Sequence, residues 1–318
     1  MRESSSAGVR FGVVNETVGS GPEWFDHVRR VEDAGVDTLL VRDHLSAGPF
    51  GPQLAPFSAL AAAAAVTARL HVGTLVLDND FRHPAFVAHE AATLHHLSGG
   101  RFQLGMGAGW YEPEYRSTGI PFDPARQRID RLEESLAIIT GLLDGTRVEH
   151  VGPSYQVSSL DLDVLPPRNG RPRLLIGAGG PRMLGIAARH ADTVGLLSSP
   201  IKNSEERDDP RDRLPAAFDQ KIATLHAKAG DRFPHLELSS FVTIRITDHR
   251  RTDTEELIAQ RGWSGIDVAT VWAMPTILIG SADQIREDLQ ARRERFGLSY
   301  LVTSDRNLAA LTKVIAGL

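Results

Sequence analysis

The sequence has no cysteine among its 318 residues, and this absence excludes several kinds of chemistry at once. Without cysteine there are no disulfides, thiolate metal ligands, iron–sulfur clusters or thiol nucleophiles. Long apolar runs are also missing, because the most apolar stretch, Ala59–Val66, is far shorter than the roughly twenty residues of a membrane-spanning helix. Residues 1–9 are Ser-rich and lack the apolar stretch of a signal peptide. These absences predict a cytoplasmic protein with no membrane contact and a disordered tail at residues 1–9.

An excess of positive charge is absent as well. The chain has 35 basic and 40 acidic residues, a formal net charge of −5 and a sequence pI near 6.2. Nucleic-acid-binding domains usually carry a basic excess, so we expect no nucleic-acid partner. Two common motifs are incomplete: Trp110 replaces the third glycine of a dinucleotide fingerprint, and Thr93 replaces the second histidine of a zinc-protease helix. The sequence therefore predicts neither a Rossmann site nor a metal site.

Eight short apolar runs alternate with longer amphipathic segments along the chain. The first four begin roughly thirty residues apart, which is the length of one strand–helix unit. The expected strands are Arg10–Val14, Thr38–Val41, Leu70–Leu77, Phe102–Met106, Arg173–Ile176, Thr193–Leu197, Leu236–Ile246 and Tyr300–Thr303. Eight such units favour a closed (β/α)₈ barrel over an open doubly wound sheet. We therefore predict an α/β TIM barrel as a single domain over residues 10–318.

Two insertions interrupt this rhythm. Val148–Val157, around a Gly-Pro pair, predicts a hairpin after the fourth strand unit. The polar, proline-containing stretch Ser198–His235 predicts a long loop after the sixth strand, with one helix at Leu214–Ala229. The rhythm resumes at Ser281–Gln284, a capping box that predicts the start of a helix.

Polar residues follow the carboxyl ends of the predicted strands, where TIM barrels place their chemistry. His44 is the only histidine directly after a strand at this edge, and its titration range suits proton transfer near neutral pH. A structural histidine tied to Asp43 or to a backbone carbonyl is the alternative, and position alone leaves both open.

A glycine turn joins the fifth predicted strand to a helix that begins near Pro181. It consists of Gly177, Ala178, Gly179 and Gly180. Unpaired N–H groups and the helix dipole attract an anion there, and Arg182 would add positive charge. We favour a phosphate site over a tight turn that requires positive φ angles. Earlier in the chain, Gly107–Gly109 offers either a floor for a flat ring or plain strand-end packing.

Taken together, six stretches resemble the bacterial luciferase-like superfamily, particularly its deazaflavin-dependent oxidoreductases. They span nearly the whole chain in family order. The stretches are Val41–His44, Leu70–Thr74, Phe81–Pro84, Gly99–Gly109 without Gln103 and Leu104, Gly177–Pro181 and Ile279–Gln284.

The resemblance implies a barrel that binds FMN or coenzyme F420, an 8-hydroxy-5-deazaflavin, at the carboxyl ends of its strands. A non-prolyl cis peptide at Leu75–Val76 would back the ring, and Asp43 and His44 would lie beside it. The implied cofactor residues are Asp43, Thr74, Leu75, Val76, Gly107, Ala108, Gly109, Trp110, Gly177, Ala178, Gly179, Gly180, Pro181 and Arg182. The glycine turn would hold the cofactor phosphate.

The resemblance favours deazaflavin over FMN, because the Asp-His pair and the Gly-Gly-Pro turn look like that branch. The branch's sugar-phosphate dehydrogenases have Glu and Trp where this chain has Trp110 and Gly48, which argues against a sugar-phosphate substrate. His44 is then the expected proton-transfer group, with Glu112 as the fallback. We predict hydride transfer between coenzyme F420 and a C=C, C=N or C=O carbon of a small molecule.

Two rival functions remain open at this point. The first is an FMN-dependent monooxygenase that uses O₂ and reduced flavin from a separate reductase. The second is a catalytically silent barrel that only binds flavin. For either enzyme reading we expect a separate cofactor-reducing enzyme and a homodimer, paired through Ala59–Ala65 and the helix that carries His95 and His96.

Overall fold

The computed structural model describes residues 8–48, 50–162, 170–198, 201–202, 205–206 and 208–318. The predicted tail, residues 1–9, therefore lies almost entirely outside the described residues. Within the described ranges, no helix combines the length and apolar character needed to cross a bilayer.

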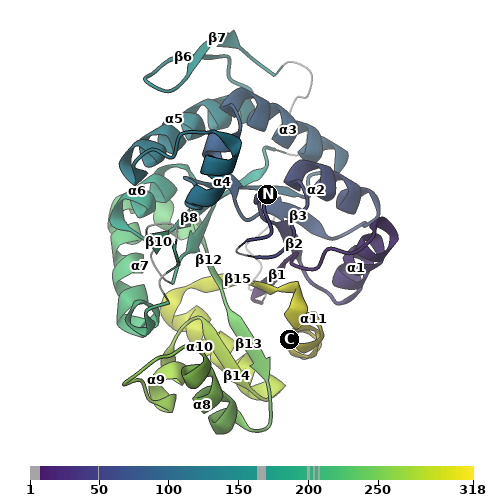
Figure 1. Cartoon of the computed structure of the whole chain (residues 1–318), viewed down its shortest axis with the longest axis vertical. Coiled ribbons are helices and arrows are strands. Elements are labelled where there is room, and N and C mark those ends of the chain that lie inside the picture. Colours follow the sequence, from purple (N-terminus) through teal and green to yellow (C-terminus); the bar gives the residue numbers. More distant parts are fainter. Residues whose placement is uncertain (1–7, 49, 163–169, 199–200, 203–204, 207) are drawn as a thin grey trace.

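Eight parallel strands close into a barrel, and helices surround it (Figure 1). The barrel strands are β1 (Arg10–Val14), β2 (Thr38–Val41), β3 (His71–Thr74), β5 (Phe102–Gly107), β8 (Arg173–Ala178), β9 (Thr193–Leu196), β12 (Glu237–Phe241) and β15 (Leu298–Ser304). Their spatial order is β3-β2-β1-β15-β12-β9-β8-β5, and pairing of β3 with β5 closes the ring. The two-residue strand β4 (Leu77–Asp78) extends this closure by pairing with β5. The predicted TIM barrel is confirmed.

Helices follow the strands, and most of them cover the outside of the barrel. They are α1 (Gly21–Asp33), α2 (Pro56–Ala65), α3 (Pro84–Leu97), α4 (Glu112–Thr118), α5 (Ala125–Leu143), α6 (Pro181–His190), α7 (Pro215–Ala229), α8 (Arg250–Gln260), α9 (Val268–Ala273), α10 (Ala282–Phe296) and α11 (Leu308–Ile315). The predicted capping box is present at α10, where the Gln284 amide donates to Ser281 Oγ at 3.3 Å and the Ser281 amide donates to Gln284 Oε1 at 3.0 Å.

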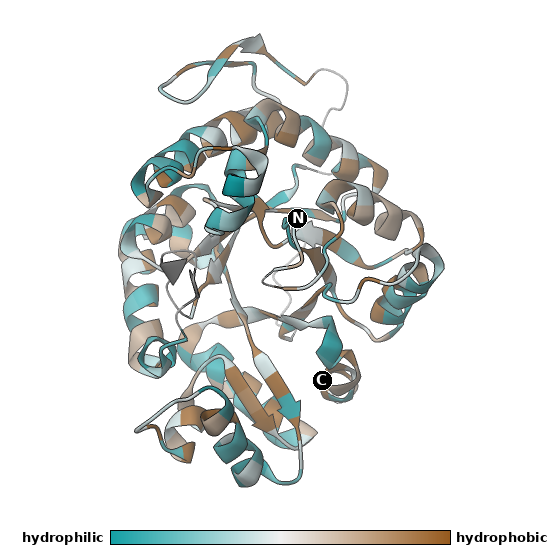
Figure 2. Ribbon diagram, viewed as in Figure 1, coloured by the Kyte–Doolittle hydropathy of each residue, from teal (hydrophilic) through white to brown (hydrophobic). Residues whose placement is uncertain are grey.

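The core has two parts because strand side chains alternate between the two faces of the barrel wall. The outward face packs against the helices and forms the largest apolar cluster. The inward face fills the barrel with a smaller cluster, on which Leu75 and Val76 pack from one end. Its members are Val14, Leu40, Leu175, Tyr300 and Val302. Figure 2 shows the resulting apolar colouring along the strands.

The prediction of one strand over Leu236–Ile246 is wrong. The chain leaves the barrel after Val242 and continues as β13 (Thr243–Ile246). The Val242 amide still donates a hydrogen bond of 2.7 Å to Val302 O of β15. The strand β13 pairs with β14 (Ile277–Gly280), which the sequence did not predict. An unbroken run of apolar residues does not show where a strand exchanges one neighbouring strand for another. The two strands, with α8 and α9, form a small module beside the barrel (Figure 1) with its own apolar core of Leu257, Trp263, Val271, Met274, Ile277 and Ile279.

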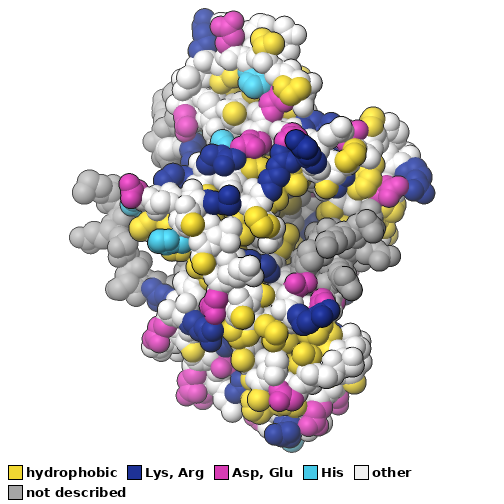
Figure 3. Space-filling view, turned by 90° about the vertical axis from the view of Figure 1, so that its left-hand side faces the viewer, with side chains coloured by type: hydrophobic (Ala, Val, Ile, Leu, Met, Phe, Trp, Pro, Cys, Tyr) yellow, Lys and Arg dark blue, Asp and Glu magenta, His cyan; other side chains and the backbone are white. Residues whose placement is uncertain are grey.

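Both predicted insertions are present. The hairpin consists of β6 (Val148–Val151) and β7 (Gln156–Leu160), and it projects beyond α5 (Figure 1). The long segment after β9 contains the short pair β10 (Ile201–Lys202) and β11 (Glu205–Glu206), a 3₁₀ turn and α7, close to its expected bounds. On the face that carries α5, α6 and α7, acidic and basic side chains are interspersed (Figure 3).

Candidate active site

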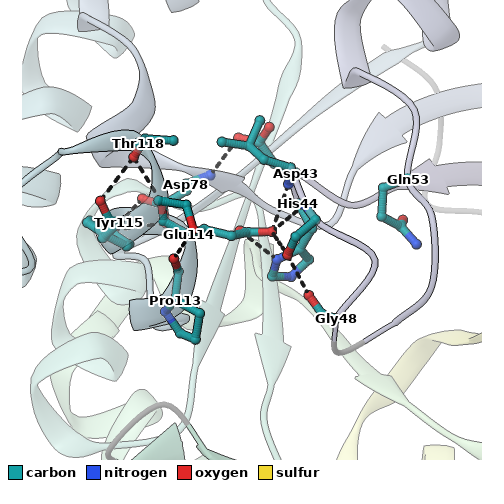
Figure 4. A network of polar contacts seen from close by, with 12 residues as sticks. Asp43, His44, Gly48, Gln53, Asp78, Pro113, Glu114, Tyr115 and Thr118 are labelled. Atoms are coloured by element: carbon teal, nitrogen blue, oxygen red, sulfur yellow. Dashed lines mark hydrogen bonds and ion pairs between the residues drawn. The ribbon is translucent and has the colours of Figure 1, made fainter.

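His44 lies in the loop after β2, at the carboxyl-terminal mouth of the barrel. Its Nδ1 is 3.0 Å from Oε2 of Glu114, which is on α4 after β5 (Figure 4). Glu114 is buried, and its second oxygen accepts hydrogen bonds from the amides of Leu45 and Ser46 at 2.8 and 2.9 Å. One carboxylate therefore holds both the imidazole and the backbone that carries it. The alternative that Asp43 or a backbone carbonyl ties His44 in place does not hold.

Glu114 is the main residue of the site that the sequence did not predict. The sequence pointed instead to Glu112, whose carboxylate bonds Arg116 Nη2 at 2.8 Å and is 41% exposed. Residues two positions apart on a helix face different directions, so only one of the two glutamates can turn toward His44. The structure turns Glu114 inward, and the catalytic role of Glu112 stays a prediction.

Three aromatic rings surround His44. The ring centroids of Phe50, Trp110 and Tyr111 lie 5.3, 5.9 and 5.9 Å from that of the imidazole. We call these three residues the aromatic collar. They come from the loops after β2 and β5, so His44 is held between two loops rather than on one. With Glu114 accepting from Nδ1–H, the other ring nitrogen, Nε2, is available for proton exchange.

Asp43 is buried and bound by the protein itself. Arg82 forms a two-pronged ion pair with its carboxylate, with Nη2 2.9 Å from Oδ1, and the amide of Asp78 donates to Oδ2 at 3.0 Å. Asp43 therefore joins the loop after β2 to β4. Its predicted cofactor contact stays a prediction.

A second carboxyl group, that of the half-buried Asp78, lies next to this network. Tyr115 donates from its hydroxyl to Asp78, with oxygen–oxygen distances of 2.8 and 2.9 Å. Burial raises the pKa of Asp78 to about 7, against the opposing effect of hydrogen bonds from the Asp80 amide and Tyr115. Glu114, next to Tyr115 on α4, bonds His44. The helix α4 therefore positions the Glu114 carboxylate and, through Tyr115, the carboxyl group of Asp78.

The predicted cis peptide between Leu75 and Val76 is present. Both side chains are half-buried and pack on the interior cluster at the mouth, a position that suits a platform for a flat ring. Thr74 has a different task, because its hydroxyl donates to Gly105 O at 2.8 Å and accepts from Gly105 N at 2.7 Å. The Thr74 side chain is fully engaged in joining β3 to β5.

The glycines at the end of β5 are explained by packing. A Cβ on Gly107 would lie 2.5 Å from Val76 Cγ2, and one on Gly109 would lie 1.8 Å from the Tyr115 hydroxyl. Gly109 also has a φ of +72°, which favours glycine. Strand-end packing, the alternative to a floor for a ring, therefore accounts for both positions. Ala108 between them is half-exposed.

The glycines of the turn between β8 and α6 behave differently. Among the described residues, and apart from the chain neighbours, a Cβ on Gly177 or Gly180 would meet no atom within 4 Å, and neither residue has a positive φ. Gly179 is closer to the protein, because a Cβ there would lie 3.2 Å from Leu197 Cβ. The tight-turn explanation therefore fails at Gly177 and Gly180, where neither φ nor crowding requires glycine. The open space fits a bound group next to the first N–H groups of α6.

Arg182 does not direct its charge to this turn. It pairs with Asp130 and donates to the carbonyl of Arg126 at 3.1 Å, both on α5. The turn therefore offers backbone N–H groups and open space. Within the described residues, no group of three or more His, Asp or Glu side chains is arranged to hold a metal ion.

Comparison with known proteins shows which family the sequence matches. Residues 9–233 match the family described as luciferase-like monooxygenase. The chain is 31% identical over 243 residues to 4-hydroxyprotoasukamycin monooxygenase of Streptomyces nodosus subsp. asukaensis, covering 76% of this chain and 61% of that protein. It is 33% identical over 203 residues to an F420-dependent glucose-6-phosphate dehydrogenase of Microbacterium testaceum, covering 62% and 58%.

These matches span about half to three fifths of the length of the curated relatives. Among solved structures, an F420-dependent secondary alcohol dehydrogenase in complex with an F420–acetone adduct superimposes with a TM-score of 0.75. That match covers 98% of each chain at 15% sequence identity, and it supports the barrel fold alone.

Proposed function

The chain belongs to the luciferase-like monooxygenase family and is a luciferase-like oxidoreductase, and on that premise we propose that it uses coenzyme F420 to reduce or oxidise an organic C=C, C=N or C=O group. The observation that carries the proposal is the open space that the described residues leave at Gly177 and Gly180, at the same mouth as His44. The names of the F420-dependent relatives support F420 over other flavins.

The residues present fit such a cofactor. The cofactor phosphate would approach past Gly180 and would be held by the first N–H groups of α6. Leu75 and Val76 would support the cofactor ring. When bound, a deazaflavin supplies or accepts a hydride and, having carbon in place of N5, does not activate oxygen. Asp43 fixes the loop beside this platform through Arg82.

His44 handles the proton that balances the hydride. Glu114 accepts from Nδ1–H, which fixes the tautomer and leaves Nε2 to give a proton to the substrate or to take one from it. The aromatic collar excludes water around the imidazole and keeps its orientation. Glu114 acts through His44, so it is a positioning residue.

An FMN-dependent monooxygenase is the second candidate. It is favoured by the monooxygenase of Streptomyces nodosus, whose match covers 76% of this chain. The deciding experiment titrates the purified protein with reduced F420 and with reduced FMN and measures oxygen uptake. Tight binding of F420 without oxygen uptake supports our proposal. Oxygen consumption with reduced FMN alone would replace it with the monooxygenase.

Variants of His44 and Glu114 test the assigned roles. His44→Ala should lower turnover by about 10²-fold or more with little change in cofactor affinity. Glu114→Gln should lower kcat while KM and cofactor affinity change little, because an amide oxygen accepts a weaker hydrogen bond from Nδ1–H and holds the imidazole less firmly. Unchanged turnover in both variants would make the pair structural.

We also propose that the protein works as a homodimer with a separate enzyme that reduces its cofactor. Within Ala59–Ala65, Ala61 and Ala62 are half-buried and only Ala65 is exposed, whereas in the helix α3 His95 is buried and His96 is exposed. A monomeric mass by light scattering at micromolar concentration would contradict the dimer.

A further inference from the structure

Large apolar side chains point inward at the mouth of the barrel. Glu237 on β12 contacts Thr193 inside the barrel, with 2.9 Å between their side-chain oxygens. Side chains alternate along a strand, so Phe241, four residues after Glu237, points to the same interior side. Leu197 is the first residue after β9, and its Cβ lies 3.2 Å from the position that a Cβ on Gly179 would take. Phe241 is 41% exposed and Leu197 is 38% exposed. Each of these two side chains therefore has apolar surface that the described residues leave uncovered.

Phe241 is connected to the aromatic collar through Arg42. Leu45, which follows His44, is 62% exposed, and the Arg42 guanidinium carbon lies 4.1 Å from the centroid of Phe50 and 6.0 Å from that of Phe241. Arg42 therefore bridges the collar to Phe241. We call Leu45, Leu197, Phe241 and the aromatic collar the apolar mouth.

Positive charges near the apolar mouth already have partners. Arg42 Nη1 is 2.6 Å from Glu16 Oε1, and Arg82 pairs with Asp43. Lys221 donates to the carbonyl oxygens of Leu197 and Ser198 at 2.8 and 3.1 Å. Among the described residues around the mouth, these cations are committed to the protein. Within the part of the chain that the structure describes, an anionic group on a substrate would face buried carboxylates, and none of these three cations is without a partner.

We propose that the substrate is an uncharged, ring-bearing apolar molecule whose reacting carbon is held at His44, and that Phe241 and Leu197 select it. This inference rests on the proposed oxidoreductase function. In the reducing direction, the carbonyl carbon would accept a hydride from the reduced deazaflavin, which is thereby oxidised, the C=O π electrons would move to oxygen, and oxygen would take the proton from His44 Nε2. Flat apolar rings bury area against Phe241 and the collar, whereas phosphate or carboxylate groups lose hydration without gaining an ion pair.

The test compares two bicyclic ketones that differ in one charged group, 2-acetylnaphthalene and 6-acetyl-2-naphthoate. Binding to the protein without cofactor is followed by quenching of tryptophan fluorescence, with Trp110→Phe to identify the responding residue. We expect the uncharged ketone to bind at least tenfold more tightly, with most of the quenching lost in Trp110→Phe. Equal or tighter binding of the carboxylate would overturn the proposal.

A matched pair of variants locates the site. Phe241→Ala should weaken binding of 2-acetylnaphthalene about tenfold, whereas Phe86→Ala should leave it unchanged, because Phe86 is a 68% exposed phenylalanine on α3. Both side chains are exposed, so neither variant removes a core residue. Equal losses, or none at Phe241, would refute the role of Phe241. Because no cofactor is present, failure of the F420 assignment leaves this readout intact.

Discussion

Two glycine-rich stretches of the same barrel look alike in sequence and differ in what surrounds them. At the end of β5, added Cβ atoms would collide with Thr74, Val76 or Tyr115. At the end of β8 and in the turn that follows, Cβ atoms on Gly177 and Gly180 would meet none of the described residues within 4 Å other than their chain neighbours. Glycine is required in the first stretch because neighbouring protein atoms occupy the position of a Cβ. In the second stretch the described residues leave that position empty at Gly177 and Gly180. Glycine runs therefore indicate a ligand only where the folded chain leaves them unfilled.

The largest effect is expected at Gly105. Its Cβ would lie 2.0 Å from Thr74 O, so alanine must push β3 and β5 apart and break two buried hydrogen bonds with Thr74. Overpacking costs about 1–3 kcal/mol or more, and each buried group left unpaired costs about 1–3 kcal/mol. Gly105→Ala should therefore lose about 5 kcal/mol of unfolding free energy, measured by urea denaturation. A loss below about 1 kcal/mol would mean that the β5 glycines are not packing-limited.

Asp78 supplies the second prediction, because its carboxyl group occupies the space next to Gly109. Its pKa rises from 3.8 to about 7 on folding, so between pH 4 and pH 7 the unfolded chain releases this proton and the folded chain keeps it. Stability then falls as pH rises through that window, by up to about 4 kcal/mol. Asp78→Asn keeps the shape and removes the titration.

The measurement is the difference in unfolding free energy between Asp78→Asn and the native chain at several pH values. The difference should move in favour of the variant from pH 4 to pH 7 and level off above pH 7. A difference that does not change with pH would show that folding does not raise the pKa of Asp78.

The sequence was sufficient for the barrel because eight apolar runs with regular spacing leave few alternative folds. It was insufficient for β13 and β14, since pairing partners are long-range and an apolar strand looks the same inside or outside the barrel. It placed His44 correctly at the mouth but selected Glu112 over Glu114. Which glutamate turns inward depends on where α4 packs, and that information is not local.

The third prediction concerns Gly180, the residue before the first turn of α6. Valine there should leave folding nearly unchanged, since its φ of −97° and ψ of 161° are ordinary for valine and its Cβ meets open space. It should weaken binding of intact F420 roughly tenfold to a hundredfold, because charge-assisted hydrogen bonds of roughly 1–3 kcal/mol are blocked. The control ligand is a deazaflavin without the phosphate, whose affinity should not change. Equal losses for both ligands would place the phosphate elsewhere.

The smallest effect has the opposite sign to that at Gly105. Gly177 lies in β8 with an extended backbone and an open Cβ position, so alanine gains strand propensity and loses freedom in the unfolded chain at no steric cost. Such a change stabilises a protein by about 0.4–1 kcal/mol. Gly177→Ala should therefore raise the urea midpoint while weakening cofactor binding, so that stability and binding move in opposite directions at one residue. If Gly177→Ala destabilises the chain as Gly105→Ala does, the space at Gly177 is filled by the protein itself, and the contrast between the two glycine stretches disappears.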